Sequence, residues 1–236
     1  MELKGQNDTI DSWKEVNLIY NAALRQVQTK MEILNEEFQH VHQYNPIEHI
    51  KARIKTPESI VKKLKRHGVE STIENMVNHI NDIAGVRIIC SFTSDIYRVA
   101  DMIRNQKDIK VIAVKDYITY PKTSGYRSYH MIVTVPVYLS DRIVDTKVEI
   151  QIRTVAMDFW ASLEHKIHYK FEGDAPQHIR TELVECARMV ADLDSRMLML
   201  NDEITMISYE LEVAKIKAEE EKRKKRLEKQ AQEAEA

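Results

Sequence analysis

Two carboxylates beside expected strands could hold a divalent metal ion. Asp82 stands just before an apolar, β-branched run. Glu149 lies in the segment 147–153, where apolar and polar residues alternate, so it shares the outward face of a strand with Gln151 and Arg153. Two carboxylates from different strands suit Mg²⁺, with nucleotide phosphates and water completing an oxygen shell. The alternative is an ordinary surface ion pair of Glu149 with a neighbouring cation.

Phosphate groups would have to be held by side chains, because the 5 glycines form no Gly-rich phosphate loop. The densest supply of cations is the segment 53–66. Within it, Ser59, Lys63 and Arg66 lie at i, i+4 and i+7, on one face of a helix that could grip a triphosphate. The alternative is that these cations complement the dipole near a helix C-terminus and are simply solvated.

A loop suited to a nucleotide base runs from Pro121 to His130. It combines a turn at Gly125, the flat ring of Tyr126 and nitrogen donors at Lys122 and at the end of the loop. A base could stack on the ring while its phosphates reach the donors.

Helices and strands must position these residues. An apolar stripe at spacings of three and four predicts a helix from Trp13 to Val41, and Thr56 and Gly68 suit the two ends of a second helix. Helical patterns also cover 94–105 and 154–169. Four β-branched runs predict strands: Val86 to Phe92, Ile109 to Val114, Tyr129 to Val135 and Lys147 to Arg153. The class is therefore α+β, with a mixed sheet of about five strands flanked by helices.

Composition narrows the setting. The chain has 236 residues, which favours one domain. Its 35 Lys and Arg residues against 37 Asp and Glu residues give a formal net charge of -2, with no global attraction to nucleic acid or to an anionic membrane. The sequence has no signal-peptide pattern and no apolar run long enough to span a bilayer. We expect a cytoplasmic protein with no membrane association.

The C-terminal region carries a seam of apolar residues in heptad spacing from Ile179 to Ala214, which predicts a long helix. The seam either packs on its own domain or mediates homo-oligomerisation. Charged residues follow, so we divide the chain into a single catalytic domain over 1–205 and a solvated helical tail over 206–236. RNA binding by the basic run Lys222 to Arg226 is not expected.

Three ordered motifs resemble the synthetase domain of the RelA/SpoT-type alarmone synthetases. They are Asp82-Ile-Ala-Gly-Val-Arg87, Lys122-Thr-Ser-Gly-Tyr-Arg-Ser-Tyr-His130 and Glu149-Ile-Gln-Ile-Arg-Thr154. The resemblance covers roughly residues 45–170 and implies a nucleotidyltransferase-like fold. The whole length is similar to the short branch called small alarmone synthetases, of the RelP-like type.

The resemblance implies a reaction: transfer of the β,γ-pyrophosphate of ATP to the ribose 3′-OH of GDP or GTP, giving AMP and ppGpp or pppGpp, without hydrolase activity. Asp82 and Glu149 would be the catalytic residues and would hold Mg²⁺. Glu149 would also orient or deprotonate the 3′-OH. Members of the family typically form homotetramers, which fits the seam.

For ATP, the resemblance implies that Arg53 and Arg87 sandwich the adenine, consistent with the planar stacking of arginine. The phosphates would be held by Lys55, Ser59, Lys63 and Arg66.

For the guanosine nucleotide, Tyr126 would stack on the base, and Lys122 and His130 would reach the 5′ phosphates. Gln151 would help to position the acceptor. Asp158 stands where many relatives are expected to carry an Asn that contacts guanine, which leaves the preference among GDP, GTP and GMP open.

Two other functions fit part of this pattern. A nucleotidyltransferase that attaches AMP to an acceptor also needs two acids and a cationic triphosphate clamp, but it releases free pyrophosphate. A non-catalytic nucleotide-sensing or RNA-binding oligomer would show no turnover.

Overall fold

Five strands form one mixed sheet in the computed structural model, which describes residues 13–42, 44–169 and 175–234. The chain forms two compact units, Met1–Asp194 and Ser195–Ala236. The elements in chain order are α1 (Trp13–Val41), β1 (Ile47–Ile54), α2 (Pro57–Arg66), α3 (Ile73–His79), β2 (Ala84–Cys90), α4 (Thr93–Arg104), β3 (Lys110–Asp116), β4 (Tyr129–Tyr138), β5 (Ile143–Thr154), α5 (Val155–Tyr169) and α6 (Gln177–Ala234).

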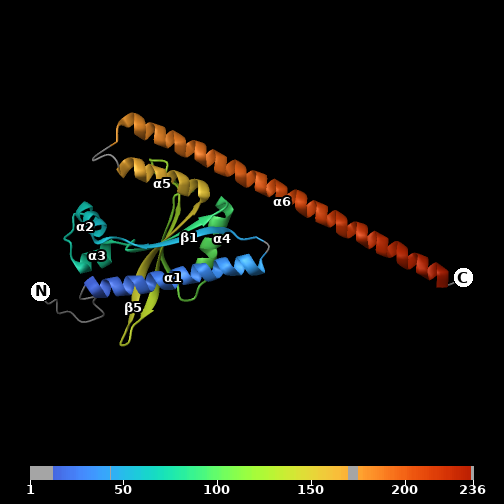
Figure 1. Cartoon of the computed structure of the whole chain (residues 1–236), viewed down its shortest axis with the longest axis horizontal. Coiled ribbons are helices and arrows are strands. Elements are labelled where there is room, and N and C mark those ends of the chain that lie inside the picture. The colour runs from blue at the N-terminus through green and yellow to red at the C-terminus, as the bar shows by residue number, and fades with distance from the viewer. Residues whose placement is uncertain (1–12, 43, 170–174, 235–236) are drawn as a thin grey trace. The chain divides into compact units, whose positions relative to one another are not determined.

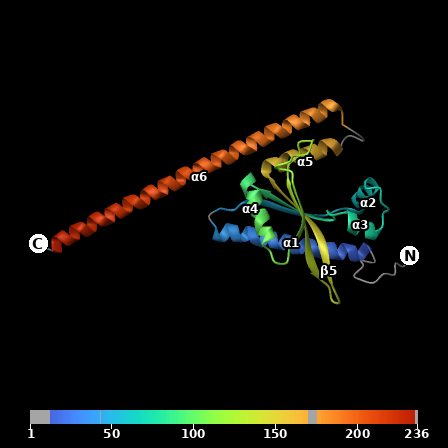
Figure 2. The ribbon, with the colours of Figure 1, turned by 180° about the vertical axis from the view of Figure 1, so that it is seen from behind.

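The strand order is β1-β2-β5-β4-β3, and only the pair β2 and β5 is parallel within the described part of the chain. In both views α1 lies along one side of the strands and α5 along the other (Figures 1 and 2). The packing of α1 on β1, β2, β4 and β5 builds the main core. The α+β class with a mixed sheet is confirmed.

The central strand β5 shows why one face of the sheet can bind polar ligands. Val148, Ile150 and Ile152 are fully buried in the core, while Glu149 and Gln151 between them are partly exposed. This is the alternation predicted from the sequence. Burial of the three β-branched side chains fixes the register, because a shift by one residue would put the acid into the core.

The helix α2 has the ends that the sequence predicts. Thr56 accepts a hydrogen bond from the backbone N–H of Ser59, and Pro57 occupies the first turn. Gly68 ends the helix region with a φ of 70°, which a residue with a side chain rarely adopts. From the last turn of α2, the ammonium of Lys63 reaches the carboxylate of Asp82.

Two elements lie outside the strands and helices predicted from the sequence. The strand β1 is an edge strand that pairs with β2, and its polar residues obscure the apolar alternation. The helix α3 has only 7 residues, too few for a readable period, although Thr72 caps it. The structure therefore adds the strand that carries Arg53.

In the second unit the predicted seam is a continuous helix within α6. The large apolar seam residues of this unit are between 45% and 63% exposed: Met197, Leu200, Ile204, Ile207 and Leu211. Side chains beyond Arg223 lie outside the described residues, so the expectation about the basic run and the tail boundary at residue 206 stay predictions. In the described segments, no helix combines the length and the apolar character needed to cross a bilayer.

Candidate active site

A cleft of about 540 Å³ opens on the polar face of the sheet. Adjacent strands supply its lining: Arg53 from β1 is paired with Gly85 of β2, and Gly85 is paired with Glu149 of β5. Asp82, just before β2, and Arg87 also line it. The pairing of three strands thus brings the predicted adenine-binding arginines and both predicted metal ligands to one cleft.

Asp82 is held between two lysines. The Nζ atom of Lys55 lies 2.7 Å from Oδ2 of Asp82, and that of Lys63 lies 2.8 Å from Oδ1. Burial opposes ionisation of this carboxyl, but the hydrogen bonds from the two ammonium groups outweigh it and hold the pKa of Asp82 below its usual value. Asp82 is therefore ionised. Each of the two ammonium groups could leave this carboxylate and bind a phosphate oxygen instead.

Asp82 should make folding stability sensitive to acid. Because its pKa lies below the unfolded value of 3.8, its ion pairs contribute stability above that value and lose it as the pH falls through the folded pKa. We expect the difference in urea midpoint between wild type and Asp82→Asn to be constant from about pH 7 to pH 5 and to change only below about pH 4. Urea unfolding across this range measures it, and a difference that is insensitive to acid contradicts the ion pairs.

Glu149 connects the cleft to the loop of Pro121 to His130. Its Oε2 accepts a hydrogen bond of 2.7 Å from the amide of Gln151, and its Oε1 lies 3.3 Å from Nδ1 of His130. Burial raises the pKa of this carboxyl, but His130 and Gln151 together lower it below its ordinary value despite repulsion from Asp82. Glu149 is thus a second ionised oxygen donor at the cleft.

The loop gathers aromatic rings around a cation, and its predicted role in base binding stays a prediction. The hydroxyl of Tyr126 lies 2.8 Å from Nε2 of His130. The ammonium of Lys122 lies 4.8 Å from the centre of the Tyr126 ring and 4.7 Å from that of Tyr117, which is cation–π distance. Tyr117 is a member that the sequence prediction missed, because it precedes the motif. A base stacking on Tyr126 would have to displace the ammonium of Lys122.

Arg153 is the main polar residue missing from the predicted site. Its guanidinium is 5% exposed and donates to the Tyr126 hydroxyl, to Gln151 Oε1 at 2.8 Å and to the hydroxyl of Ser128 at 3.2 Å. Its Cζ also lies 5.0 Å from the centre of the Tyr126 ring. Strand alternation placed Arg153 on the correct face, but only the folded loop shows that it supports the tyrosine.

Asp158, in the first turn of α5, contacts arginines on both sides. Its Oδ1 accepts from Arg87 at 3.0 Å and from Arg153 at 3.2 Å. The predicted contact with guanine stays a prediction, since this carboxylate oxygen is shared by two guanidinium groups.

Ser59 and Arg66 are exposed on α2, and the structure does not bring them to the carboxylate that Lys63 contacts. The hydroxyl of Ser59 accepts a 3.0 Å hydrogen bond from Thr56, next to the start of the helix. Their predicted contacts with phosphates remain predictions.

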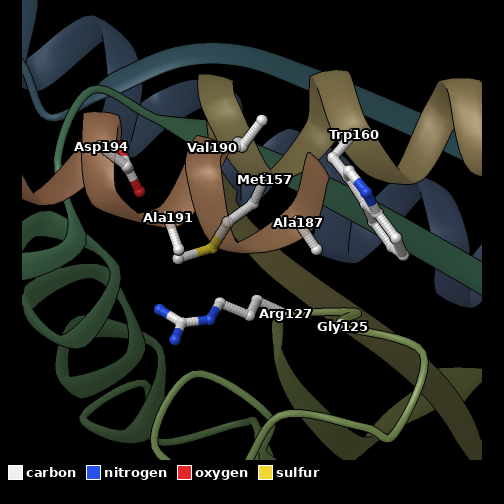
Figure 3. A pocket seen from close by; sticks show the side chains of 8 residues that line it. All are labelled: Gly125, Arg127, Met157, Trp160, Ala187, Val190, Ala191 and Asp194. Carbon is white, nitrogen blue, oxygen red and sulfur yellow. The ribbon is translucent and has the colours of Figure 1, made fainter. Parts of the chain in front are cut away.

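The back of the loop rests on the first turns of α6. Figure 3 shows Gly125 beneath Ala187, with Trp160 of α5 beside them, in a small pocket that Arg127 also lines. Gly125 has a φ of 87°, and a Cβ placed on it would lie 2.4 Å from the Cβ of Ala187. At the far side of the same pocket, the buried Asp194 accepts a 2.8 Å hydrogen bond from Thr154, which caps α5.

Gly125→Ala should weaken guanosine binding more than ATP binding. The alanine would meet both a disfavoured backbone conformation and the contact with Ala187, so the loop that carries Tyr126 would have to move. We expect the KM for GDP to rise by about 10-fold or more, with the KM for ATP within about twofold. Steady-state kinetics measures both constants, and Gly68→Ala, a second glycine of positive φ with open space around it, is the matched control.

Comparison with known proteins places this geometry in a family. A family model described as "Region found in RelA / SpoT proteins" matches residues 52–174. The chain is 50% identical over 195 residues to GTP pyrophosphokinase YwaC of Bacillus subtilis, covering 83% of this chain and 93% of that protein. It is 35% identical to GTP pyrophosphokinase YjbM of the same organism, covering 81% and 90%.

Solved structures agree with these matches. The crystal structure of small alarmone synthetase 2 from Bacillus subtilis superposes with a TM-score of 0.74 at 49% identity, covering 81% of this chain and 98% of that one. Small alarmone synthetase 1 from Bacillus subtilis, bound to its product pppGpp, gives 0.77 at 33% identity, covering 81% and 97%. The finer, RelP-like resemblance stays a prediction. The chain belongs to the RelA/SpoT family, as its three ordered motifs predict.

Proposed function

We propose that this chain is a GTP pyrophosphokinase that transfers the β,γ-pyrophosphate of ATP to the ribose 3′-OH of GDP or GTP in the cytoplasm. The products are AMP and ppGpp or pppGpp. One observation carries the proposal: Glu149 lines the cleft together with Asp82 and also contacts His130 of the aromatic loop. A nucleotide in the cleft and a nucleotide on the loop would therefore meet at one carboxylate.

On the ATP side, Arg53 and Arg87 would hold the adenine, and Lys55 and Lys63 would bind the phosphates. The lysines contact Asp82 in the free protein, so a triphosphate would exchange one set of anionic oxygens for another. This exchange would leave the oxygens of Asp82 free to hold a metal ion that accompanies the nucleotide. ATP binding and metal binding should therefore depend on each other.

The donor set fits Mg²⁺. Asp82 and Glu149 are both ionised carboxylates at one cleft, and a hard cation prefers such oxygen ligands. Among the described residues, no group of three or more His, Cys, Asp or Glu side chains is placed to hold a metal. We propose that nucleotide phosphates and water complete the shell. Bound Mg²⁺ would neutralise charge on the transferring group.

The acceptor hydroxyl would lie beside Glu149. The 3′-oxygen attacks the β-phosphorus of ATP. The bond from that phosphorus to the oxygen that bridges it to the α-phosphorus breaks, and AMP leaves with that oxygen. Because the pKa of Glu149 is lowered, it is a weak base, and its main work is to orient the hydroxyl and to take the proton late in the transfer. Most of the acceleration then comes from alignment and charge neutralisation.

On the guanosine side, Tyr126 would stack on the base with Arg153 supporting it. The ammonium of Lys122 would leave the two tyrosine rings for the 5′ phosphates, which His130 would also approach. Gln151, which is hydrogen-bonded to both Glu149 and Arg153, would hold the carboxylate beside the ribose at a fixed distance from the residues that contact the base.

Chromatography of one incubation tests the proposal. With ATP, GDP and Mg²⁺, we expect AMP and a more highly phosphorylated guanosine nucleotide in equal amounts, and no products when EDTA replaces Mg²⁺. Free pyrophosphate with an adenylylated acceptor would instead indicate a nucleotidyltransferase. Absence of any turnover with intact nucleotide binding would indicate a sensing protein.

We further propose that the exposed seam of α6 mediates homo-oligomerisation, in a tetramer. Five seam residues between Met197 and Leu211 are about half exposed, and a stripe in heptad spacing fits another helix. Leu200→Glu combined with Ile207→Glu should reduce the mass measured by light scattering to that of a smaller species. Met206→Glu, at a more exposed position off the seam, should leave the mass unchanged. An unchanged mass for the double variant contradicts the proposal.

A further inference from the structure

We propose that Asp158 is a positioning residue that couples the two nucleotide sites, so that each nucleotide strengthens the binding of the other. This inference rests on the proposed function, because it takes ATP to contact Arg87 and the guanosine base to contact Tyr126. It differs from a direct contact between Asp158 and guanine, which would alter one site only.

The coupling begins at a single atom. Oδ1 of Asp158 accepts from Nη1 of Arg87 at 3.0 Å and from Nη1 of Arg153 at 3.2 Å. The carboxylate is 15% exposed, so water screens these ion pairs only weakly. Neither arginine can change its position without changing the field and the hydrogen bonding that the other receives.

On one side of this atom, Arg153 belongs to the guanosine loop. Its guanidinium donates to Ser128 and to the hydroxyl of Tyr126, and its Cζ lies 5.0 Å from the centre of the Tyr126 ring. A base that stacks on Tyr126 would fix this ring, and with it the guanidinium on which Asp158 depends.

On the other side, Arg87 belongs to the ATP cleft. Its side chain is 28% exposed, and within the described part of the chain its ion pair is to Asp158. Among the residues that the structure describes, its buried Nε has no hydrogen-bond partner. An arginine held at one end by a single carboxylate can adjust when adenine stacks on it.

Charge explains why the shared carboxylate is needed. Burial lowers the pKa of Arg87, and repulsion by Arg153 and then by Arg53 acts in the same direction, against the attraction of Asp158. Without Asp158, two guanidinium groups would repel each other between the sites. The first nucleotide orders the carboxylate and both arginines, and the second then finds its arginine already placed, which gives positive coupling.

Calorimetry with two probes tests the coupling without turnover. The probes are GDP and AMPCPP, an ATP analogue whose α–β bridge cannot be cleaved. We expect AMPCPP to tighten GDP binding to the wild type by about 5-fold or more, and GDP to tighten AMPCPP binding by the same factor. Asp158→Asn keeps the size of the side chain and removes its charge, and the factor should fall below about twofold. Asp158→Glu keeps the charge and should retain part of the wild-type coupling factor.

Asp145→Asn, the same change at an exposed position at the other end of β5, is the control and should keep the wild-type factor. A wild-type factor near one overturns the proposal. So does an Asp158→Asn variant whose GDP affinity falls equally with and without AMPCPP, because that result indicates a guanine contact alone. A wild type that shows coupling but makes no alarmone in the product assay overturns the proposed function and leaves the coupling standing.

Discussion

Turnover should fall by about 10²- to 10⁴-fold when Glu149 is replaced by glutamine, while the protein stays folded. Glutamine keeps the size of the side chain and can still bond Gln151, so the strand β5 has no reason to move. It lacks the charge that binds a metal and faces His130, and it cannot accept the proton of the 3′-OH. Formation of AMP at saturating ATP, GDP and Mg²⁺ measures kcat.

The control for this loss is Glu70→Gln, an exposed residue between α2 and α3 that undergoes the same chemical change away from the cleft. It should keep wild-type turnover. Circular dichroism and thermal melting of both variants separate a lost activity from a lost fold. If Glu149→Gln keeps kcat within about threefold of wild type, Glu149 has neither the metal-binding role nor the activating role.

The face of the strand on which each site residue of β5 lies could be derived from the sequence. The pattern around Glu149 placed the acid outward and its apolar neighbours inward, and the structure confirms this. The reason is that successive side chains of a strand point to opposite faces, so burial of the β-branched residues on one face places their neighbours on the other. Similarly, Thr56 and Gly68 marked the ends of α2 because caps are local interactions.

Contacts between distant segments could not be derived in this way. Arg53 lies on an edge strand, β1, whose pattern is obscured by exposed polar residues, so its pairing opposite Gly85 needed the tertiary structure. Arg153 was on the expected face, but its hydrogen bond to Tyr126 joins residues 27 positions apart. Asp158 shows the same limit, since two arginines from two strands meet it.

Replacing Lys55 and Lys63 together with methionine should raise the KM for ATP by about 100-fold or more. Each ammonium makes a charge-assisted hydrogen bond, for which about 1.5–3 kcal/mol is typical, and the two act on the same triphosphate. Methionine retains an unbranched chain of similar length, so packing changes little. The affinity for GDP should stay within about twofold, because neither lysine lies at the loop of Tyr126.

The double change should also alter Asp82. With both ammonium groups gone, burial and repulsion by Glu149 both act to raise the pKa of Asp82. In the proposed function the metal binds together with ATP, so weaker ATP binding also weakens metal binding. Loss of ATP affinity should therefore be accompanied by a higher Mg²⁺ requirement, which a titration of turnover against Mg²⁺ measures.

Lys62→Met with Lys65→Met, two exposed lysines of α2, the helix that also carries Lys63, is the matched control and should change neither constant. This control separates two explanations of the basic helix that the sequence left open. If the cations of this segment only complement the helix dipole and are solvated, neither double variant loses ATP affinity. If phosphate oxygens replace the Asp82 oxygens as partners of Lys55 and Lys63, only this pair of lysines matters.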